Sequence, residues 1–273
     1  MKYSKINHLI KSKLFENRSI NEIRTNFTSG ETFVSSFLKA KKANGSATEK
    51  NSLKTLDSYG NELSKREDLI DFSLFGINEK QTVSSVYQRA ASKLKWCHFF
   101  YFLSKNDKVT NILEIGTNLG VSGQYFIAAL GNNNIKNSNF ITFEGVPDLC
   151  KIANERFLKI SEDKNCNYKI IQGLYKDTLH EVDDLNIKFD IVFIDGNHKY
   201  KPTIEYYEYL LNHSNNNAVF IFDDINWSNE MKQAWQYILN TNYSYSIDFF
   251  KTGIIVIEKD NNLKKNYNLF LTL

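Results

Sequence analysis

A glycine turn between an apolar run and a helical segment constrains this chain more than any other feature. The run Ile112-Leu113-Glu114-Ile115 leads into Gly116-Thr117-Asn118-Leu119-Gly120, and Ser122 opens an apolar segment of helical character. Glycine allows the backbone to bend sharply and to approach a ligand closely. A strand, a tight glycine turn and a helix open a nucleotide-binding βαβ unit. The spacing Glu114-x-Gly116-x-x-x-Gly120 differs from G-x-G-x-x-G, so by itself it also fits an ordinary strand-to-helix turn.

Apolar runs alternate with helical patterns along the rest of the chain. Beyond 112–115, we expect strands at 140–143, 168–171, 189–194 and 218–222, and a closing antiparallel hairpin at 244–250 and 253–258. Strands that alternate with helices predict a parallel sheet with right-handed crossovers. The most apolar runs fit strands buried on both faces. The predicted fold class is therefore α/β, with a Rossmann-like, doubly wound, mostly parallel sheet of seven strands that ends in the hairpin.

The first 80 residues carry a different pattern. Apolar residues within 1–40 have helical spacing, the polar stretch 39–51 predicts a loop or mobile linker, and residues 52–80 are only weakly periodic. One helix is predicted over 82–104. We therefore expect a helical N-terminal extension at 1–80 that serves as a lid, followed by a Rossmann-like domain at 81–273.

Composition excludes several classes of protein. Apolar residues make up 42% of the 273 residues and aromatic residues 14%, which is enough for a packed core. No run of about 18 apolar residues is present, so no transmembrane helix is expected. The basic N-terminus lacks the sustained apolar core of a signal peptide. Three widely spaced cysteines argue against a disulfide framework and predict a reducing, cytoplasmic location: Cys97, Cys150 and Cys166.

The net charge of +3 conceals an asymmetry between the two parts of the chain. Residues 1–108 hold 19 Lys and Arg against 11 Asp and Glu, a net of +8, and residues 109–273 hold 15 against 20, a net of −5. The basic part could meet an anionic partner. Its lysines are scattered among Asn and Ser without a compact cluster, which favours an ordinary solvated surface.

Acidic residues follow four of the predicted strands. They are Glu114, Glu144, Asp195 and the pair Asp223-Asp224. In such a sheet, ligands bind beyond the carboxyl ends of the strands, and so many carboxylates repel one another unless a cation or hydrogen bonds intervene. Glu144, after the second strand, suits hydrogen bonding to ribose hydroxyls. Asp223 or Asp224 could instead cap the helix that follows.

Four segments resemble, in order and spacing, the motifs of class I S-adenosylmethionine (SAM)-dependent methyltransferases: EIGTNLGVS, FEGVP, FDIVFIDGNHKY and VFIFDDINW. The sequence is most similar to small-molecule O-methyltransferases with Asp-Gly-x-His after the fourth strand, over residues 82–258. The resemblance implies that SAM is the cofactor. It also implies a set of cofactor-binding residues: Glu114, Gly116, Thr117, Asn118, Gly120, Ser122, Glu144, Gly145, Gln172, Gly173 and Asp195.

The branch that is similar to catechol O-methyltransferase holds a divalent cation. Its ligand positions correspond to Asp195, Asp223 and Asp224, whose oxygens suit Mg²⁺ or another hard divalent cation. The catalytic Lys of that branch is replaced here by His198, which can serve as a base near neutral pH or can cap the next helix. His198 and Asp195 are the predicted catalytic residues. The other histidines are predicted to be ordinary residues with no constellation around them: His8, His98, His180 and His213.

The function implied is transfer of a methyl group from SAM to a hydroxyl of a small polar molecule, with a metal that lowers the pKa of the acceptor oxygen. A nucleic-acid methyltransferase is the first alternative, but the Asn/Asp-Pro-Pro-Tyr motif common in such enzymes is absent, since the only prolines are Pro147 and Pro202. A non-catalytic SAM-binding scaffold is the second. We expect a small-molecule acceptor as partner, no nucleic acid and no membrane, and the sequence leaves a homodimer open.

Overall fold

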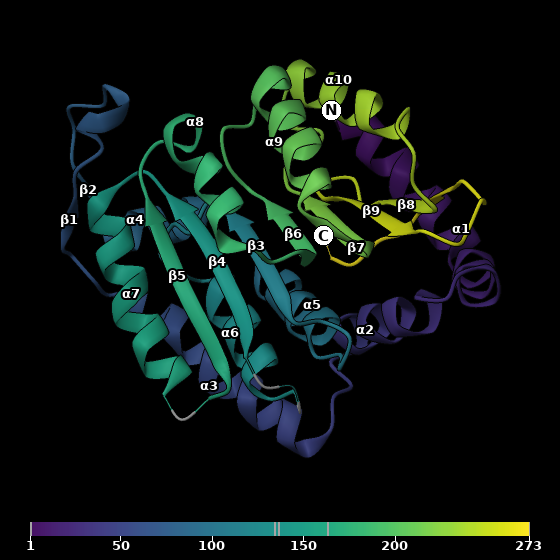
Figure 1. The fold of residues 1–273 in the computed structure, drawn as a ribbon, viewed down its shortest axis with the longest axis horizontal. Coiled ribbons are helices and arrows are strands. Elements are labelled where there is room, and N and C mark those ends of the chain that lie inside the picture. The colour runs from purple at the N-terminus through teal and green to yellow at the C-terminus, as the bar shows by residue number, and fades with distance from the viewer. Residues whose placement is uncertain (1, 134, 136, 163, 273) are drawn as a thin grey trace. The chain divides into compact units, whose positions relative to one another are not determined.

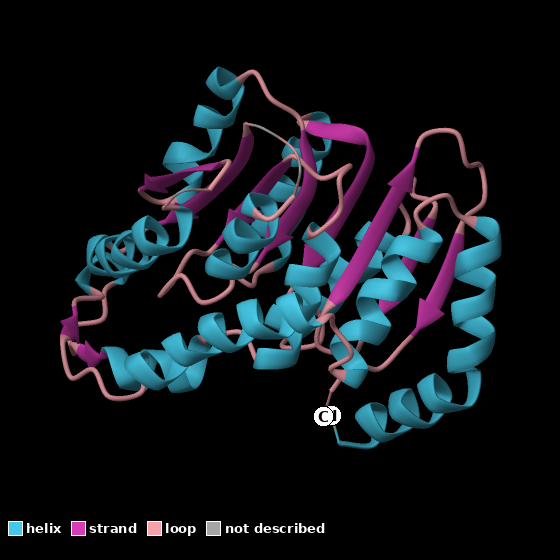
Figure 2. Ribbon diagram, turned by 90° about the horizontal axis from the view of Figure 1, so that it is seen from below, coloured by secondary structure: helices cyan, strands magenta, loops and turns pink. Residues whose placement is uncertain are grey.

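The computed structural model describes residues 2–133, 135, 137–162 and 164–272 (Figure 1). The chain divides into two compact units. The central unit is Leu38–Asn186, and the terminal unit combines Met1–Phe37 with Ile187–Leu273. Each unit contains both helices and strands, which Figure 2 draws in separate colours.

Three parallel strands form the sheet of the central unit, in the order β3-β4-β5. Because these strands run in parallel, their carboxyl ends lie at one edge, where Glu144 pairs in register with Gln172. The connecting helix α6 is almost entirely buried, as its apolar sequence requires. The elements are β3 (Asn111–Ile115), α6 (Gly123–Gly131), β4 (Ser138–Glu144), α7 (Pro147–Ser161), β5 (Cys166–Gln172), α8 (Tyr175–Thr178) and η2 (Leu179–Leu185).

The segment before β3 differs from the prediction in two places. A helix begins inside the predicted linker 39–51, because Ser46 and Glu49 form a capping box in which each side chain accepts a hydrogen bond from the backbone of the other. The predicted helix 82–104 is two helices, broken where Lys93 is extended. The elements are α3 (Ala47–Leu63), β1 (Leu69–Ile70), η1 (Ser73–Phe75), β2 (Gln81–Thr82), α4 (Val83–Ala90) and α5 (Leu94–Ser104).

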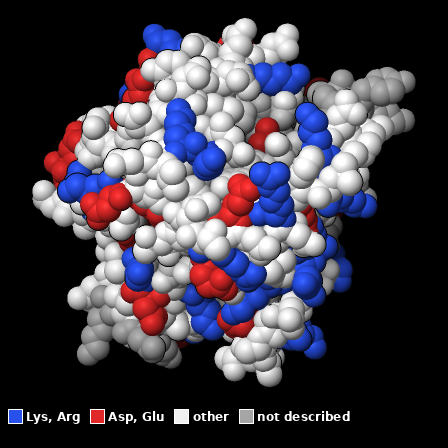
Figure 3. Space-filling model, turned by 90° about the vertical axis from the view of Figure 1, so that its right-hand side faces the viewer, with Lys and Arg blue, Asp and Glu red and all other residues white. Residues whose placement is uncertain are grey.

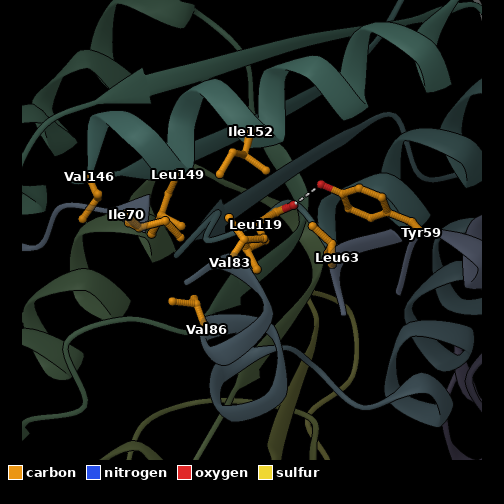
Figure 4. Close-up of a cluster of buried hydrophobic side chains, with 9 residues drawn as sticks. All are labelled: Tyr59, Leu63, Ile70, Val83, Val86, Leu119, Val146, Leu149 and Ile152. Carbon is orange, nitrogen blue, oxygen red and sulfur yellow. Dashed lines mark hydrogen bonds between the residues drawn. The ribbon is translucent and has the colours of Figure 1, made fainter. Parts of the chain in front are cut away.

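A buried apolar cluster attaches this segment to the glycine turn (Figure 4). Leu119, inside the turn, packs among side chains from α3, α4 and α7, and Tyr59 donates a hydrogen bond from its hydroxyl to the Leu119 carbonyl at 3.0 Å. The cluster therefore fixes the turn from the side opposite the strands. Its members are Tyr59, Leu63, Ile70, Val83, Val86, Leu119, Val146, Leu149 and Ile152.

The terminal unit holds five strands in the order β10-β8-β9-β7-β6. The pairs β6–β7 and β8–β10 are parallel, whereas β9 runs antiparallel to both β7 and β8. The elements are α1 (Lys2–Asn26), β6 (Phe189–Ile194), α9 (Tyr200–Asn212), β7 (Ser214–Phe222), α10 (Asn229–Leu239), β8 (Tyr245–Asp248), β9 (Gly253–Glu258) and β10 (Lys265–Asn268). Helix α2 (Gly30–Lys42) begins in this unit and ends in the central one.

The N-terminal residues are packed into the terminal unit. The backbone N–H groups of Thr28 and Ser29 donate to the Glu258 carboxylate at 3.1 and 2.6 Å, and Phe33 and Phe37 are buried. Residues 1–37 thus supply part of this unit's core. The boundary at residue 80 and the lid role of residues 1–80 stay predictions.

The α/β class, the mostly parallel pairing and the closing antiparallel hairpin β8–β9 are confirmed. Among the described residues, the strands β3 to β10 number eight, one more than the seven that were predicted. The extra one, β10, was not expected because Lys-Asn-Tyr-Asn is polar and only Tyr267 is buried. None of the helices in the described ranges combines the length and apolarity that a membrane span needs.

Replacement of Leu63 tests the cluster around the glycine turn. Leu63 is fully buried, so Leu63→Ala should lower the free energy of unfolding by about 2–5 kcal/mol through lost burial and a residual cavity. Urea denaturation measures the change. Leu158→Ala, at a leucine of the same unit with 57% of its surface exposed, is the control and should shift it by less than about 0.5 kcal/mol. Equal effects of the two variants would contradict this packing.

Candidate functional site

The glycine turn after β3 adopts a backbone that requires its glycines. Gly116 and Gly120 have φ of 105° and 72°, and Asn118 is left-handed at 49°. A Cβ on Gly120 would lie 2.9 Å from the Phe157 ring, so α7 packs against bare backbone there. The N–H groups of Gly116 and Thr117 both donate to the Phe143 carbonyl, which ties the turn to β4. The turn is thus a fixed, side-chain-poor surface at the sheet edge.

Glu144, at the end of β4, is held by backbone donors. Its Oε2 accepts from the Asn118 N–H at 2.8 Å and its Oε1 from the Val146 N–H at 2.9 Å. Burial raises the pKa of Glu144, while the backbone hydrogen bonds act in the opposite direction. Each carboxylate oxygen has a further lone pair. The carboxylate is therefore held in a fixed orientation and keeps capacity to accept a further hydrogen bond.

Glu114 lies inside the unit, away from solvent. Ser122 donates to its carboxylate at 2.5 Å and Thr142 at 2.8 Å, and Thr142 also bonds Thr117 at 2.6 Å. Burial raises the pKa of Glu114 to about 8. Glu114 and Ser122, both predicted to bind the cofactor, are bonded to each other here. This network fixes the start of α6 and the end of β3.

Two glycines follow β4 and β5 side by side. The Gly173 N–H donates to the Glu144 carbonyl at 2.9 Å, and a Cβ on Gly145 would lie 3.7 Å from the Gly173 carbonyl oxygen. Gly173 has φ of 149° and faces Thr178, so a side chain there would clash. Gln172, beside them, is exposed. The structure thus brings Asn118, Glu144, Gly145 and Gly173 together, and their binding of a cofactor stays a prediction.

In the terminal unit, Asp195 and His198 follow β6. His198 Nε2 lies 3.6 Å from Asp195 Oδ1, and Asn197 between them is left-handed at φ 51°. The N-cap of α9 is Lys199, which makes no side-chain cap bond. His198 therefore does not cap this helix, and its imidazole faces the Asp195 carboxylate instead.

The two acids after β7 lie beside a lysine in the predicted closing hairpin, Lys251. Lys251 Nζ lies 2.5 Å from Asp223 Oδ2 and 3.4 Å from Asp224 Oδ1. Thr252 donates to the other Asp223 oxygen at 3.0 Å. Burial and the neighbouring Asp223 raise the pKa of Asp224. Burial alone would lower the pKa of Lys251, but the two carboxylates outweigh it and raise that pKa.

Neither acid caps the following helix, because the Ser228 side chain accepts from the Met231 N–H and fills that role. Within the described ranges, no group of three or more His, Cys, Asp or Glu side chains is arranged to hold a metal ion. The Lys251 ammonium lies between the two acids that were predicted to bind a divalent cation. As the side chains lie, this donor set fits an ammonium group and does not fit a divalent cation.

Two of the histidines predicted to have no constellation around them lie beside carboxylates. His98 Nε2 lies 2.9 Å from Asp57 Oδ1, which also accepts from the Tyr125 hydroxyl at 2.7 Å. His8 lies 3.7 Å from Asp248. Asp57 and His98 are 41 residues apart, so no local pattern points to the pair.

The pH dependence of the unfolding free energy tests the buried network around Glu114. Its pKa of about 8 means that the folded protein keeps a proton that the unfolded chain releases near pH 4.5, so this contribution to stability falls as pH rises between those values. Wild-type protein should therefore lose about 1–3 kcal/mol of unfolding free energy between pH 5.5 and 8 from this group. Glu114→Gln, which cannot ionise, should lose correspondingly less. Urea denaturation across that range gives the slopes, and equal slopes would contradict the assignment.

The comparisons with known proteins agree with this geometry. Residues 113–225 match the Methyltransf_24 family, described as a methyltransferase domain. A comparison with curated proteins finds no match. Among solved structures, the O-methyltransferase from Bacillus cereus in complex with SAH is 16% identical, with a TM-score of 0.54, 81% of this chain covered and 96% of that chain.

Two further solved structures share the fold. The O-methyltransferase TomG from Streptomyces achromogenes, involved in tomaymycin synthesis and solved with SAM, is 15% identical with a TM-score of 0.52, and the match covers 76% of this chain and 89% of that one. The SAH-bound Podospora anserina methyltransferase PaMTH1 is 16% identical with a TM-score of 0.52, covering 75% and 96%. At such identities the likeness establishes the fold. Residues 113–225 thus match a methyltransferase domain, and the fold is one that these methyltransferases share, in agreement with the motif-based prediction.

Proposed function

We propose that this methyltransferase binds SAM on the central unit and transfers its methyl group to a hydroxyl of a small polar molecule. The observation that carries the proposal is the Glu144 carboxylate, which the Asn118 and Val146 N–H groups hold in place at the carboxyl end of β4. Adjacent ribose hydroxyls are donors of the right number and spacing for such a carboxylate. The glycine turn Gly116–Gly120 would accommodate the aminoacyl end of SAM.

The remaining predicted cofactor residues take supporting roles in this proposal. Glu114 and Ser122 position the turn through their mutual hydrogen bond, and Thr117 joins them through Thr142. Gly145, Gln172 and Gly173 would lie along the nucleoside. Asp195 was also predicted to contact the cofactor. In this proposal it acts on the acceptor side instead, because its carboxylate lies beside His198.

His198 is the proposed base. It would take the proton of the acceptor hydroxyl, and the Asp195 carboxylate at 3.6 Å would stabilise the imidazolium that forms. The acceptor oxygen attacks the sulfonium methyl, the carbon–sulfur bond breaks, and S-adenosylhomocysteine (SAH) leaves with the electron pair. Two proteins whose solved structures share this fold, from Bacillus cereus and Streptomyces achromogenes, are O-methyltransferases, which supports an oxygen acceptor.

The metal-assisted form of this reaction, predicted from the sequence, would require the Lys251 side chain to move away from Asp223 and Asp224. In its observed position, the Lys251 ammonium already balances the negative charge of both carboxylates. We propose that Lys251 supplies the positive charge of this site and that Mg²⁺ is not needed. Asp223 and Asp224 then hold Lys251, with Thr252 fixing the Asp223 carboxylate.

The nucleic-acid alternative has less support. On the face drawn in Figure 3, acidic side chains lie among the Lys and Arg side chains. A phosphate-binding surface would instead present a continuous basic patch. The scaffold alternative is less favoured because the glycine turn, Glu144 and His198 each offer chemistry that a methyl transfer would use.

SAM affinity tests the role of Glu144. Glu144→Ala should weaken SAM binding by about 1–3 kcal/mol, because the variant loses charged hydrogen-bond acceptors for the ribose. Isothermal titration calorimetry on folded protein measures the change. Glu155→Ala, at a half-exposed glutamate on α7 of the same unit, is the matched control and should leave affinity unchanged. No SAM binding by folded wild-type protein would contradict the proposal as a whole.

Titration with Mg²⁺ separates the lysine form from the metal form. Wild-type protein should show no heat of Mg²⁺ binding, and once an acceptor is known its turnover should persist in EDTA. Lys251→Met removes the ammonium and leaves Asp223 and Asp224 uncompensated, so this variant should melt at lower temperature and regain stability with Mg²⁺. Lys232→Met, on α10 of the same unit, is the control. Turnover that EDTA abolishes and Mg²⁺ restores in wild-type protein would show the metal form to be correct.

A further inference from the structure

Helix α1 (Figure 1) presents large apolar side chains to solvent along its first half. Ile6, Ile10 and Leu14 leave 46%, 51% and 73% of their surface accessible, and Phe15, beside Leu14, leaves 52%. Because the three aliphatic residues recur at every fourth position, they lie on one side of the helix, about one turn apart. We call Ile6, Ile10, Leu14 and Phe15 the outer stripe of α1.

The other side of the same turns is small and polar. Ser12 and Ser19 are buried there, and His8 Nε2 lies 3.1 Å from the Leu269 carbonyl oxygen. A helix that only covers a folded unit turns its large apolar residues inward and its polar residues outward. The first turns of α1 do the reverse, whereas Ile23, in the last turns, is buried in the ordinary way. Packing within the terminal unit therefore does not account for the outer stripe.

Lysines flank the outer stripe. Lys11 and Lys13 fall on opposite sides of it, since successive residues of a helix are about 100° apart. Both lysines are exposed, and neither forms an ion pair with a residue that the structure describes. The sequence holds no Asp or Glu before Glu16. The outer stripe is therefore an apolar ridge with a cationic border.

The charge of this border selects among the possible partners. In a dimer formed through two outer stripes, the lysines of both copies would lie along one seam and repel one another. An anionic partner would be attracted instead. Nucleic acid offers phosphates, but contacts to its backbone are polar and would leave the large apolar side chains in water. The partner that fits is anionic at its surface and apolar beneath it.

The outer stripe is convex, because it runs along the exposed side of a helix. A folded protein that bound it would need a matching groove, whereas the acyl chains of a bilayer close around protruding side chains without one. An amphipathic helix of this kind lies in the plane of the membrane interface, with its apolar residues below the headgroups. Lysines at its border reach anionic headgroups through their long side chains.

We infer that the outer stripe of α1 binds the surface of a membrane that contains anionic lipids. Ile6, Ile10 and Leu14 enter the upper acyl region, and Lys11 and Lys13 contact lipid phosphates. Such a helix lies on the surface and needs no spanning segment, and the described ranges contain none. Membrane binding was not expected from the sequence, which lacks an apolar run of spanning length. This role goes beyond the proposed methyl transfer and does not depend on it.

Co-sedimentation of the full-length protein with lipid vesicles tests the inference. Wild-type protein should bind vesicles of phosphatidylcholine and phosphatidylglycerol in equal parts, and should bind vesicles of pure phosphatidylcholine much more weakly. Leu14→Glu should lower the partition coefficient on the mixed vesicles about 10-fold, because it removes a buried leucine and adds a charge that the headgroups repel. Leu158→Glu, at an exposed leucine on α7, is the matched control and should bind as wild type does.

The lysines are tested separately from the apolar residues. The double variant Lys11→Gln, Lys13→Gln should bind the mixed vesicles about 10-fold less tightly, since each lysine near an anionic surface contributes to binding. The double variant Lys151→Gln, Lys159→Gln, at exposed positions of α7, changes the net charge equally and should bind as wild type does. All of these side chains are exposed, so circular dichroism should show the same helix content and melting temperature in every variant.

Four results would overturn the inference. In the first, wild-type protein stays in solution with the mixed vesicles at low salt. In the second, Leu14→Glu binds as tightly as wild type, or the two double lysine variants weaken binding equally, so that the attraction is a general effect of charge. In the third, analytical ultracentrifugation shows a dimer that Leu14→Glu dissociates, without vesicle binding, which assigns the stripe to contact between copies. In the fourth, the protein binds polyglutamate but not vesicles, which indicates an acidic protein partner.

Discussion

The central unit depends on how the Glu144 carboxylate is held. Its two oxygens accept from Asn118 in the glycine turn and from Val146 at the start of α7, and its own carbonyl accepts from Gly173 after β5. Three segments separated in sequence are thereby joined at one residue. A buried carboxylate is costly unless hydrogen bonds satisfy it, so the geometry of the turn and the charge of the acid support each other.

The same principle acts with a different partner in the terminal unit. Asp223 and Asp224 lie beside each other in a half-buried setting, where two like charges would repel. Lys251 removes that repulsion at 2.5 and 3.4 Å. Either a lysine ammonium or a divalent cation can neutralise two neighbouring carboxylates. Which of the two does so depends on whether the fold brings a lysine side chain beside them.

Positions of unusual backbone geometry coincide with the candidate site residues. Asn118, Asn197 and Asp224 are all left-handed without being glycine, and each lies in the loop after a parallel strand. Such conformations persist only where surrounding contacts determine them. In this protein, the contacts are those of Glu144 with Asn118 and of Lys251 with Asp224.

Sequence alone determined the order of strands and helices, the glycine turn and the acids at the strand ends, because local periodicity and backbone demands are written in neighbouring residues. It also contains the Ser-x-x-Glu pattern of the capping box at Ser46 and Glu49. Only the tertiary structure decided the contacts between residues that are distant in the chain. Lys251 meets Asp223 across 28 residues, His98 meets Asp57 across 41, and Phe75 lies beside Gly145. No local pattern encodes such pairings, since they arise only when packing and sheet register bring separate segments to the same place.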